Sequence, residues 1–283
     1  MATGQALFVP MLLLCSAVSL APARADIVVS SDPSQNMSCS AGVCVPTASS
    51  AVLNVNDLET LLSSGNVKVT TTGSGVQAND IDIAAALGWS NASALALDAY
   101  DSISINSAVA VSGAGGVSLT TNDGGSGGEI SFGSTGDVSF TNLSSALTIN
   151  GSPFQLVGSI SDLATAIANN PSGAYALAAN YDASADGTYS QAPIQTVFTG
   201  TFEGLGNTIS SLSIHDVTDD SFDGLFEEVG SNGTVRDIGL SDASVDGPRA
   251  YRIGALAAEI DSAAIVSGAW STGEVSGATS KAK

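Results

Sequence analysis

Basic residues are nearly missing from this sequence. None occurs between Lys68 and Arg236, and the whole chain has 7 Lys and Arg against 27 Asp and Glu. The resulting formal charge of −20 repels nucleic-acid phosphates and anionic lipid headgroups, so we expect neither as a partner. Two interpretations of the acidity stay open: the solubility of a secreted protein, or a set of calcium sites.

Histidine and cysteine are also scarce, with one histidine and three cysteines in the chain. His215 has no Ser or Cys motif around it, so a nucleophilic triad is not indicated. Cys39 and Cys44 are closely spaced, and in an exported protein such a pair favours a disulfide. Free thiols are the alternative, and metal binding would need further ligands. We predict a Cys39–Cys44 disulfide, no catalytic residue, no cofactor and no metal site.

Long apolar runs are confined to the amino terminus. Residues 6–20 are apolar and lead to Pro22 and the small-x-small sequence Ala23-Arg24-Ala25. This pattern predicts a signal peptide over residues 1–25, cleaved before Asp26, with a lone membrane anchor as the alternative. No later stretch is long enough to cross a bilayer. We therefore expect a secreted or cell-surface protein that is not an integral membrane protein.

Aromatic residues make up only 5% of the chain, whereas 31 glycines separate many short apolar-x-apolar triplets. Each triplet is typical of a three-residue strand with two inward side chains. Ile81 and Ile103 are 22 residues apart, as are Leu95 and Val117, while Val109–Ile130 and Val117–Val138 are 21 residues apart. The nine triplets cover residues 67–69, 81–83, 95–97, 103–105, 109–111, 117–119, 130–132, 138–140 and 147–149.

This spacing predicts one coil per repeat, and hence an all-β, right-handed parallel β-helix. A β-sandwich is the alternative, but the glycine-rich corners do not indicate clean two-residue hairpins. Short capping or inserted helices are expected near residues 56–64 and 161–169. Asn56 with Glu59 is typical of a capping box, and Ser161 is the expected cap of the second helix.

A longer repeat follows, in which residues 206–214 align with residues 232–240 at an offset of 26. The run from about Gly158 to Gly277 resembles bacterial surface proteins with GLUG motifs. The resemblance lies in the segments 175–177, 182–184, 198–209, 224–226, 233–235, 252–257 and 270–277. Ala255 and Ala257 stand where the motif has glycine. The first half is similar to the shaft of filamentous-haemagglutinin-like exoproteins.

Four regions follow from these patterns. Residues 1–25 form the signal peptide, and residues 26–52 an irregular segment with the disulfide loop. Residues 53–157 form haemagglutinin-like β-helix coils, and residues 158–283 GLUG-like coils that end after one closing repeat, as in a truncated member.

The resemblance implies a secreted or surface-exposed, non-enzymatic, adhesin-like exoprotein of a Gram-negative cell. Its expected partners are a host, cell-surface or matrix receptor and an outer-membrane export partner. The alternatives are a carbohydrate-active β-helix enzyme, acting as a polysaccharide hydrolase, and a non-functional fragment of a longer exoprotein.

Several other residues carry weaker signals. Asp219 with Asp220, and Asp182 with Asp186, are the acid pairs that a hydrolase would use, although turns also favour Asp. Residues 124–129 resemble one imperfect copy of a calcium-binding repeat, with a flexible glycine-rich corner as the preferred interpretation. The aromatic residues expected to fill the core or corners, rather than to form a sugar platform, are Trp89, Trp270, Phe198 and Phe202.

Overall fold

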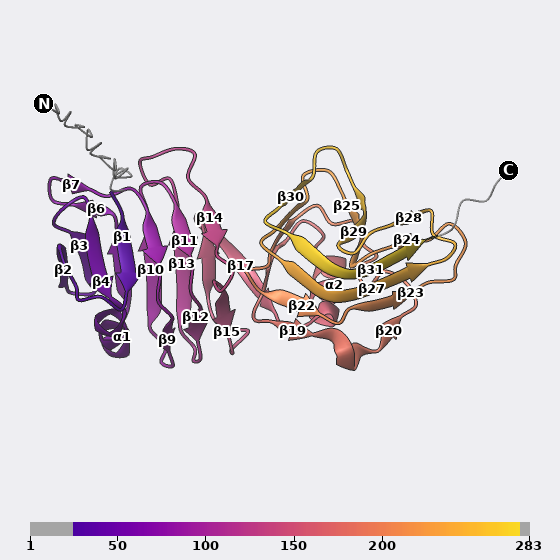
Figure 1. Ribbon diagram of the computed structural model, residues 1–283, viewed down its shortest axis with the longest axis horizontal. Coiled ribbons are helices and arrows are strands. Elements are labelled where there is room, and N and C mark those ends of the chain that lie inside the picture. The colour runs from indigo at the N-terminus through magenta and orange to yellow at the C-terminus, as the bar shows by residue number, and fades with distance from the viewer. Residues whose placement is uncertain (1–24, 278–283) are drawn as a thin grey trace, which may run out of the picture.

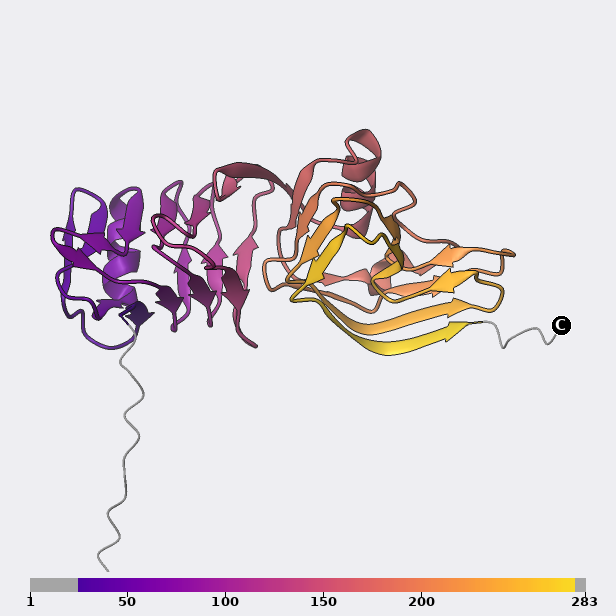
Figure 2. The ribbon, with the colours of Figure 1, turned by 90° about the horizontal axis from the view of Figure 1, so that it is seen from above.

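The computed structural model describes residues 25–277 and shows two stacked solenoids that follow one another along the long axis (Figures 1 and 2). The regular elements of the described part are nearly all short strands, most of them paired in parallel, together with two α-helices and one short 3-10 helix. The predicted all-β parallel β-helix is therefore confirmed. The signal peptide expected over residues 1–25 lies outside the described residues, apart from its last position.

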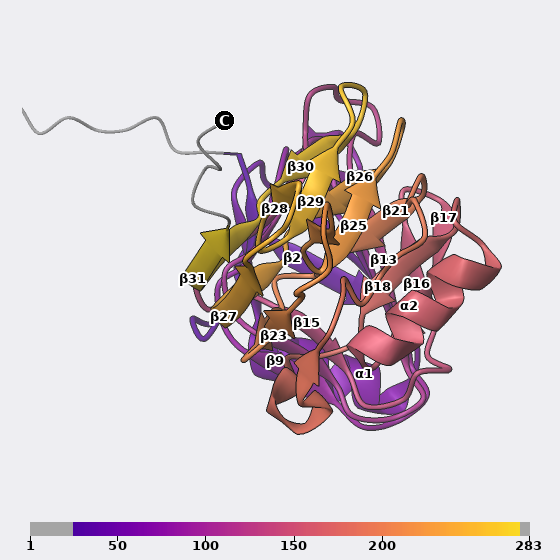
Figure 3. The ribbon, with the colours of Figure 1, turned by 90° about the vertical axis from the view of Figure 1, so that its right-hand side faces the viewer.

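One sheet runs through both solenoids, and we call it the shared sheet. Its strands, in spatial order, are β2 (Met37–Ser40), β3 (Val43–Pro46), β5 (Val67–Thr70), β10 (Ala94–Asp98), β13 (Gly116–Thr120), β16 (Leu147–Ile149), β17 (Ser152–Val157), β18 (Ala174–Leu177), β21 (Thr201–Glu203), β26 (Thr234–Arg236) and β30 (Ile265–Ser267). Figure 3 shows its last strands, β21, β26 and β30, side by side.

The first solenoid, residues 27–149, has two further sheets. One has the order β14 (Ile130–Phe132), β11 (Ile103–Ile105), β8 (Ile81–Ile83), β1 (Ile27–Ser30) and β4 (Ala51–Asn54). The other has the order β15 (Val138–Phe140), β12 (Val109–Val111) and β9 (Leu87–Trp89). A small hairpin joins β6 (Thr72–Gly73) and β7 (Val76–Gln77).

The second solenoid, residues 152–277, is completed by three more sheets. The largest contains β19 (Tyr181–Asp182), β22 (Thr208–Ser210), β27 (Gly239–Gly247), β23 (Ser213–His215), β20 (Thr188–Tyr189) and β31 (Trp270–Gly277). Two pairs join β24 (Phe222–Asp223) to β28 (Arg252–Ile253) and β25 (Phe226–Val229) to β29 (Ala257–Ile260). The 3-10 helix η1 (Ala183–Asp186) follows β19.

Identical inward residues stack from coil to coil, because in-register parallel strands place equivalent side chains above one another. Ile27, Ile81, Ile103 and Ile130 form one such ladder. Ile27, Ile81 and Ile103 are fully buried, and burying each of them contributes roughly 2 kcal/mol, which lets a chain with few aromatic residues form a core.

The coil that contains residues 121–129 is longer than the spacing predicted. Val109 pairs with Val138, and Val117 pairs with Leu147, so the equivalences Val109–Ile130 and Val117–Val138 were wrong. The glycine-rich loop at residues 122–128 lengthens this coil. The offset of 26 in the second solenoid was also wrong, since Ile209 pairs with Leu240.

Each α-helix lies near the start of a solenoid. In α1 (Val55–Ser64), Leu58 and Leu62 are one turn apart and fully buried. The side chain of Glu59 accepts a hydrogen bond from the backbone N–H of Gly88 on β9, 2.9 Å away. The helix therefore covers the open edge of β9.

Both predicted helix caps lie two residues too late. Asn54 caps α1, and its side chain accepts from the N–H groups of Asn56 and Asp57. Ser159 caps α2 (Ile160–Asn169) and accepts from the N–H of Asp162. In both helices the capping side chain precedes the residue that the sequence pattern indicated.

The winding reverses its strand direction at a two-residue hairpin. Asn150 and Gly151, both at positive φ (49° and 78°), connect β16 to the antiparallel β17. Such a turn needs two left-handed residues, and Asn-Gly is its typical sequence. A second hairpin of this kind joins β2 to β3 through Ala41 and Gly42. The expectation that the corners contain no clean two-residue hairpins was wrong.

The shared sheet also changes its inner face at this reversal. Leu156 on β17 packs with the core of the first solenoid, whereas its neighbour Val157 packs with the core of the second. Ala176 and Leu177 on β18 divide in the same way. Because strand direction and inner face change together, the sense of winding is the same in both solenoids.

Candidate functional site

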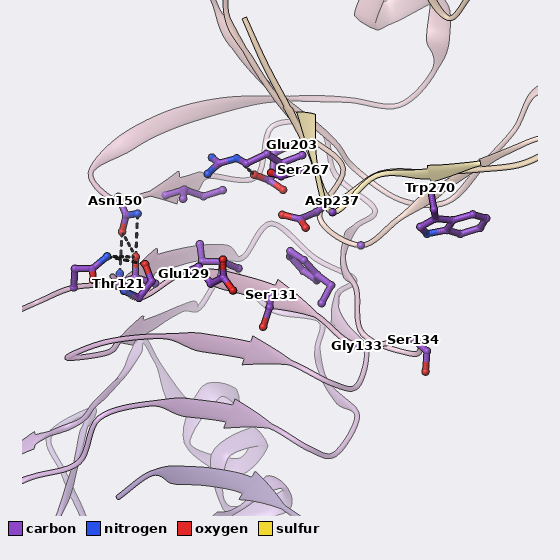
Figure 4. A pocket seen from close by; sticks show the side chains of 18 residues that line it. Thr121, Glu129, Ser131, Gly133, Ser134, Asn150, Glu203, Asp237, Ser267 and Trp270 are labelled. Carbon is purple, nitrogen blue, oxygen red and sulfur yellow. Dashed lines mark hydrogen bonds and ion pairs between the residues drawn. The ribbon is translucent and has the colours of Figure 1, made fainter. Parts of the chain in front are cut away.

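The three sheets of the first solenoid end differently at the junction with the second. The shared sheet continues from β16 into β17, as described above. The edge of β15 is covered by corner segments of the second solenoid. The remaining sheet ends at β14, which pairs with β11 only. A pocket lies beside this end strand, between the two solenoids (Figure 4).

Backbone hydrogen bonds fix the two solenoids to each other at β15. The N–H of Val138 donates to the carbonyl oxygen of Leu205 at 3.0 Å, and the N–H of Phe140 donates to that of Ala178 at 2.6 Å. Asn207 is fully buried beside them. Its side-chain Nδ2 donates to the carbonyl oxygens of Val138 (3.0 Å), Leu177 (3.3 Å) and Gly204 (3.0 Å). These contacts hold the pocket walls in place.

The corner at Leu205 and Gly206 needs its glycine. Gly206 has a φ of +76°, and a Cβ there would lie 2.4 Å from the carbonyl oxygen of Gly136 in the first solenoid. Any other residue would push the two solenoids apart. Leu205 itself has a φ of 57°, which is unusual for a leucine.

The junction pocket has a volume of about 690 Å³, within the range of ligand sites. Both solenoids contribute to its walls. From the first come Thr121, Asn122, Gly128, Glu129, Ile130, Ser131, Phe132, Gly133, Ser134 and Ile149, from the connecting hairpin comes Asn150, and from the second come Glu203, Gly206, Arg236, Asp237, Ser267, Gly268 and Trp270.

Glu203 is the most unusual of these residues. In the register of the shared sheet, Glu203 lies beside Ala176 on one side and Arg236 on the other, and Arg236 in turn lies beside Ser267. These side chains share the face of the sheet that points away from the second core. Its side chain is only 4% exposed, and its Oε1 atom makes no hydrogen bond. The other oxygen, Oε2, lies 3.4 Å from Nε of Arg236. Nε of Arg236 makes no hydrogen bond either, so a buried acceptor and a buried donor lie unpaired beside the pocket, an arrangement that is costly without a ligand or water.

Burial raises the pKa of Glu203 to about 8, and the negative charge of Asp237 adds to the rise, while Arg236 opposes it. Burial also raises the pKa of Asp237, and Glu129 adds to that rise, while contacts with Glu203 and Arg236 oppose it. Because both pKa values are raised, this pair of carboxyl groups holds a proton at higher pH than isolated carboxyl groups do.

The carboxyl groups reach the pocket from two sides. In Figure 4, Glu203 and Asp237 come from the second solenoid, and Glu129 comes from the first, next to Ser131 of β14. Arg236 is the one basic side chain that lines the pocket. The pocket thus has three carboxyl groups, those of Glu129, Glu203 and Asp237, against one guanidinium, and it is therefore acidic.

Side-chain hydrogen bonds stiffen the wall that the first solenoid supplies. Oδ1 of Asn150 accepts from the N–H of Thr121 at 2.9 Å. Oδ1 of Asn122 accepts from the N–H of Gly128 at 2.7 Å, and its Nδ2 donates to the carbonyl oxygen of the same glycine at 2.9 Å. The two hydrogen bonds between Asn122 and Gly128 thus close the glycine-rich loop. Gly128 and Glu129, at the end of the segment that resembled a calcium-binding repeat, line the pocket.

The acid pairs considered in the sequence lie elsewhere. Asp219 and Asp220 are in an exposed corner, where Asp219 lies 3.4 Å from Arg249. Asp182 caps η1, and its pKa is lowered by the N–H of Ser184. Asp186 accepts hydrogen bonds from Tyr181 (2.6 Å) and Tyr189 (2.7 Å). Asp182 and Asp186 are therefore both engaged in hydrogen bonds that hold the local structure together.

The other sequence candidates are also distributed along the molecule. Cys39 and Cys44 form a disulfide across the β2–β3 hairpin. His215 is exposed, with its Nδ1 2.8 Å from Oδ2 of Asp246. Of the four aromatic residues, Trp89, Phe198 and Phe202 are buried, whereas Trp270 is 52% exposed and lines the junction pocket.

Sequence reasoning missed Glu203, Arg236 and Asp237. Glu203 lies within the GLUG-like segment 198–209, and nothing in that pattern shows that its side chain faces away from the core. The available signals were the Asn150-Gly151 hairpin and Arg236 itself, the only basic residue between Lys68 and Arg249. Together, these two signals could have indicated that Arg236 pairs with a carboxylate near the point where the strand direction reverses.

A model of the family described as the M26 IgA1-specific metallo-endopeptidase N-terminal region matches residues 156–273, nearly the whole second solenoid. No curated protein and no solved structure matches the chain significantly. The chain is thus similar to this peptidase region along part of its length. The comparisons support no GLUG or haemagglutinin family.

This match corrects two expectations from the sequence. The non-enzymatic, adhesin-like function and the prediction that the protein is not an enzyme were both wrong, because the matched family is a peptidase family and points to a protease-related function. The match is consistent with the expected extracellular location. Within residues 25–277, no helix is long and apolar enough to span a membrane.

A zinc centre, which a metallo-endopeptidase implies, does not fit the residues present here. Zinc peptidase motifs of the H-E-x-x-H type need two histidines, and the sequence has only His215. No group of three or more His, Cys, Asp or Glu side chains in the described part of the chain could hold a metal ion. The site therefore offers binding and proton exchange through its own carboxyl groups.

Proposed function

We propose that this protein serves a protease-related function, in which its solenoids bind the polypeptide substrate of a metallo-endopeptidase. The observation that carries the proposal is the match of residues 156–273 to the N-terminal region of that peptidase family. The junction pocket supports it, because one of its walls belongs to the matched region and supplies Glu203, Arg236 and Asp237.

The description of the matched family names IgA1, so IgA1 is the first substrate to test. An immunoglobulin is an extracellular protein, and the apolar run at residues 6–20 would direct this chain out of the cell. The receptor and the outer-membrane export partner expected from the sequence stay predictions, as do the proposed region boundaries. The resemblance of residues 158–277 to GLUG repeats also stays a proposal, and it concerns only the sequence of the repeat unit.

The test is a binding measurement with the full chain. IgA1 is immobilised on a biosensor, and IgG serves as a matched surface. We expect binding to IgA1 at least about tenfold tighter than to IgG, as selective recognition of one immunoglobulin requires. Equal binding to both immunoglobulins, or binding to neither, would overturn the proposed function.

A further inference from the structure

We propose that the junction pocket binds an extended polypeptide segment, which pairs with the free edge of β14 and places a lysine or arginine side chain against Glu203 and Asp237. This inference names the substrate chemistry of the proposed function and rests on it. It is carried by the free strand edge, by the unpartnered buried oxygen of Glu203, and by the charge of the pocket.

The free edge belongs to β14. This strand ends its sheet and pairs only with β11, through Ile130–Ile103, Ser131–Ser104 and Phe132–Ile105. All three of its residues line the pocket. An unpaired edge presents backbone N–H and carbonyl groups to an added strand, which is how many proteins bind extended peptides. An added segment of about three residues would match the length of β14.

The carboxyl groups select the side chain of that segment. Oε1 of Glu203 lacks a hydrogen-bond partner within a side chain that is only 4% exposed. Asp237 lies beside it, and Glu129 faces both from the first solenoid. An ammonium or guanidinium group contributes only donors, so it would satisfy these acceptors, whereas a carboxylate or phosphate would be repelled.

An organic cation fits this arrangement better than a metal ion does. The carboxyl groups of Glu129, Glu203 and Asp237 do not form a cluster close enough to coordinate a metal. A guanidinium is wide and planar and can bridge groups that lie farther apart. The pocket volume of about 690 Å³ leaves room for the backbone of the segment as well.

The charge of the whole protein favours the same ligand. Lys68 is the only basic residue within residues 26–235, and the net charge of the chain is −20. A strongly acidic surface speeds the approach of basic segments and repels acidic ones. The pocket should therefore meet basic segments more often than acidic ones, and most clearly at low ionic strength.

Binding of the cation would release the proton that the carboxyl pair holds. The charged groups that act on Glu203 are Arg236 on β26 and Asp237 directly after it, and Glu129, before β14, acts on Asp237. A new positive charge beside Glu203 favours its ionised form, so the proton leaves to solvent as the segment enters. Affinity for a basic segment should therefore rise with pH between about 6 and 8.5.

The experiment uses the full chain and two five-residue peptides, acetyl-Thr-Val-Arg-Val-Thr-amide and the same peptide with neutral citrulline in place of arginine. Binding is measured by calorimetry at low ionic strength, where screening is weak. We expect the arginine peptide to bind at least about tenfold tighter than the citrulline peptide, as loss of a charge-assisted contact predicts. Equal affinity for the two peptides would overturn the inference.

Glu203→Gln is the decisive variant, because it keeps the shape of the protonated side chain and removes the charge. We expect at least about tenfold weaker binding of the arginine peptide and loss of most of its pH dependence. Glu274→Gln, an exposed carboxylate on β31 outside the pocket, is the matched control and should bind like the wild type. Wild-type affinity in the Glu203 variant would refute the assignment.

Two further arms separate the parts of the inference. Agmatine carries a guanidinium without a peptide backbone, and agmatine binding as tight as that of the arginine peptide would refute the pairing with β14. Ser267→Arg places a cation of the protein itself at the exposed mouth of the pocket and should abolish peptide binding. If the peptide binds and IgA1 does not, the proposed function fails while the pocket assignment stands, and the reverse result overturns the pocket alone.

Discussion

Asn207 fixes the two solenoids to each other, so replacing it tests the junction directly. Its Nδ2 group has two hydrogens, which three backbone carbonyl oxygens share, those of Val138, Leu177 and Gly204. Asn207→Ala removes both donors and leaves buried carbonyl groups without them. Asn207→Asp keeps the shape but directs a carboxylate at the same three oxygens.

The expected cost follows from these contacts. Leaving two buried acceptors without donors costs about 4 kcal/mol, and removing the amide oxygen of Asn207, which itself has no partner, returns about 1 kcal/mol. We expect Asn207→Ala to lower the free energy of unfolding by about 3 kcal/mol. The Asp variant should lose more, because a buried charge facing acceptors is worse than an empty space. Asn91→Ala, which removes two partly buried bonds, one to the carbonyl oxygen of Leu62 and one from the N–H of Ser93, should cost about 2 kcal/mol.

The assay is urea unfolding followed by circular dichroism, combined with hydrogen exchange. The amides of Val138 and Phe140, which donate across the junction, should exchange faster in the Ala variant. The amide of Ile103, in the middle of the first solenoid, should not change. A loss below about 1 kcal/mol, or an Asp variant as stable as the Ala variant, would refute the role assigned to Asn207.

Three further predictions concern the cores, the disulfide and the carboxyl pair. Phe226 stacks on Phe198 with ring centroids 5.6 Å apart, so Phe226→Ala should cost about 3–5 kcal/mol in urea unfolding; a loss below about 1 kcal/mol would contradict this packing. Reducing the Cys39–Cys44 disulfide, whose cysteines are 5 positions apart, should lower stability by at most about 2 kcal/mol, measured by melting with and without reductant. Because the pKa of Glu203 is raised from 4.5 to about 8, the folded state holds more protons, and stability should fall as pH rises between these values; Glu203→Gln should flatten that slope in unfolding curves.

Much of the fold could be predicted from the sequence because stacking depends on a local pattern. Triplets such as 81–83 and 103–105 carry their inward residues at every second position, and parallel pairing keeps them in register. The pairing of later coils could not be predicted in the same way. The loop at residues 122–128 changes the coil length, and a constant spacing cannot account for it.

The candidate site was largely hidden from the sequence. Glu203 follows Phe202, and alternation alone places one of them inward without showing what the other faces. What it faces is the end of the first solenoid, and that depends on the reversal at Asn150-Gly151 and on the change of inner face at β17. Both are tertiary features, so a carboxyl group that the sequence places on an outer surface becomes buried.

The junction pocket takes no residue before Thr121, so the earlier coils of the first solenoid contribute nothing to its lining. Evolution could add or delete whole windings there, each changing the length by about 4.8 Å, without disturbing the pocket chemistry. That arm would then act as an adjustable spacer, setting how far the pocket stands from whatever lies at the amino-terminal end.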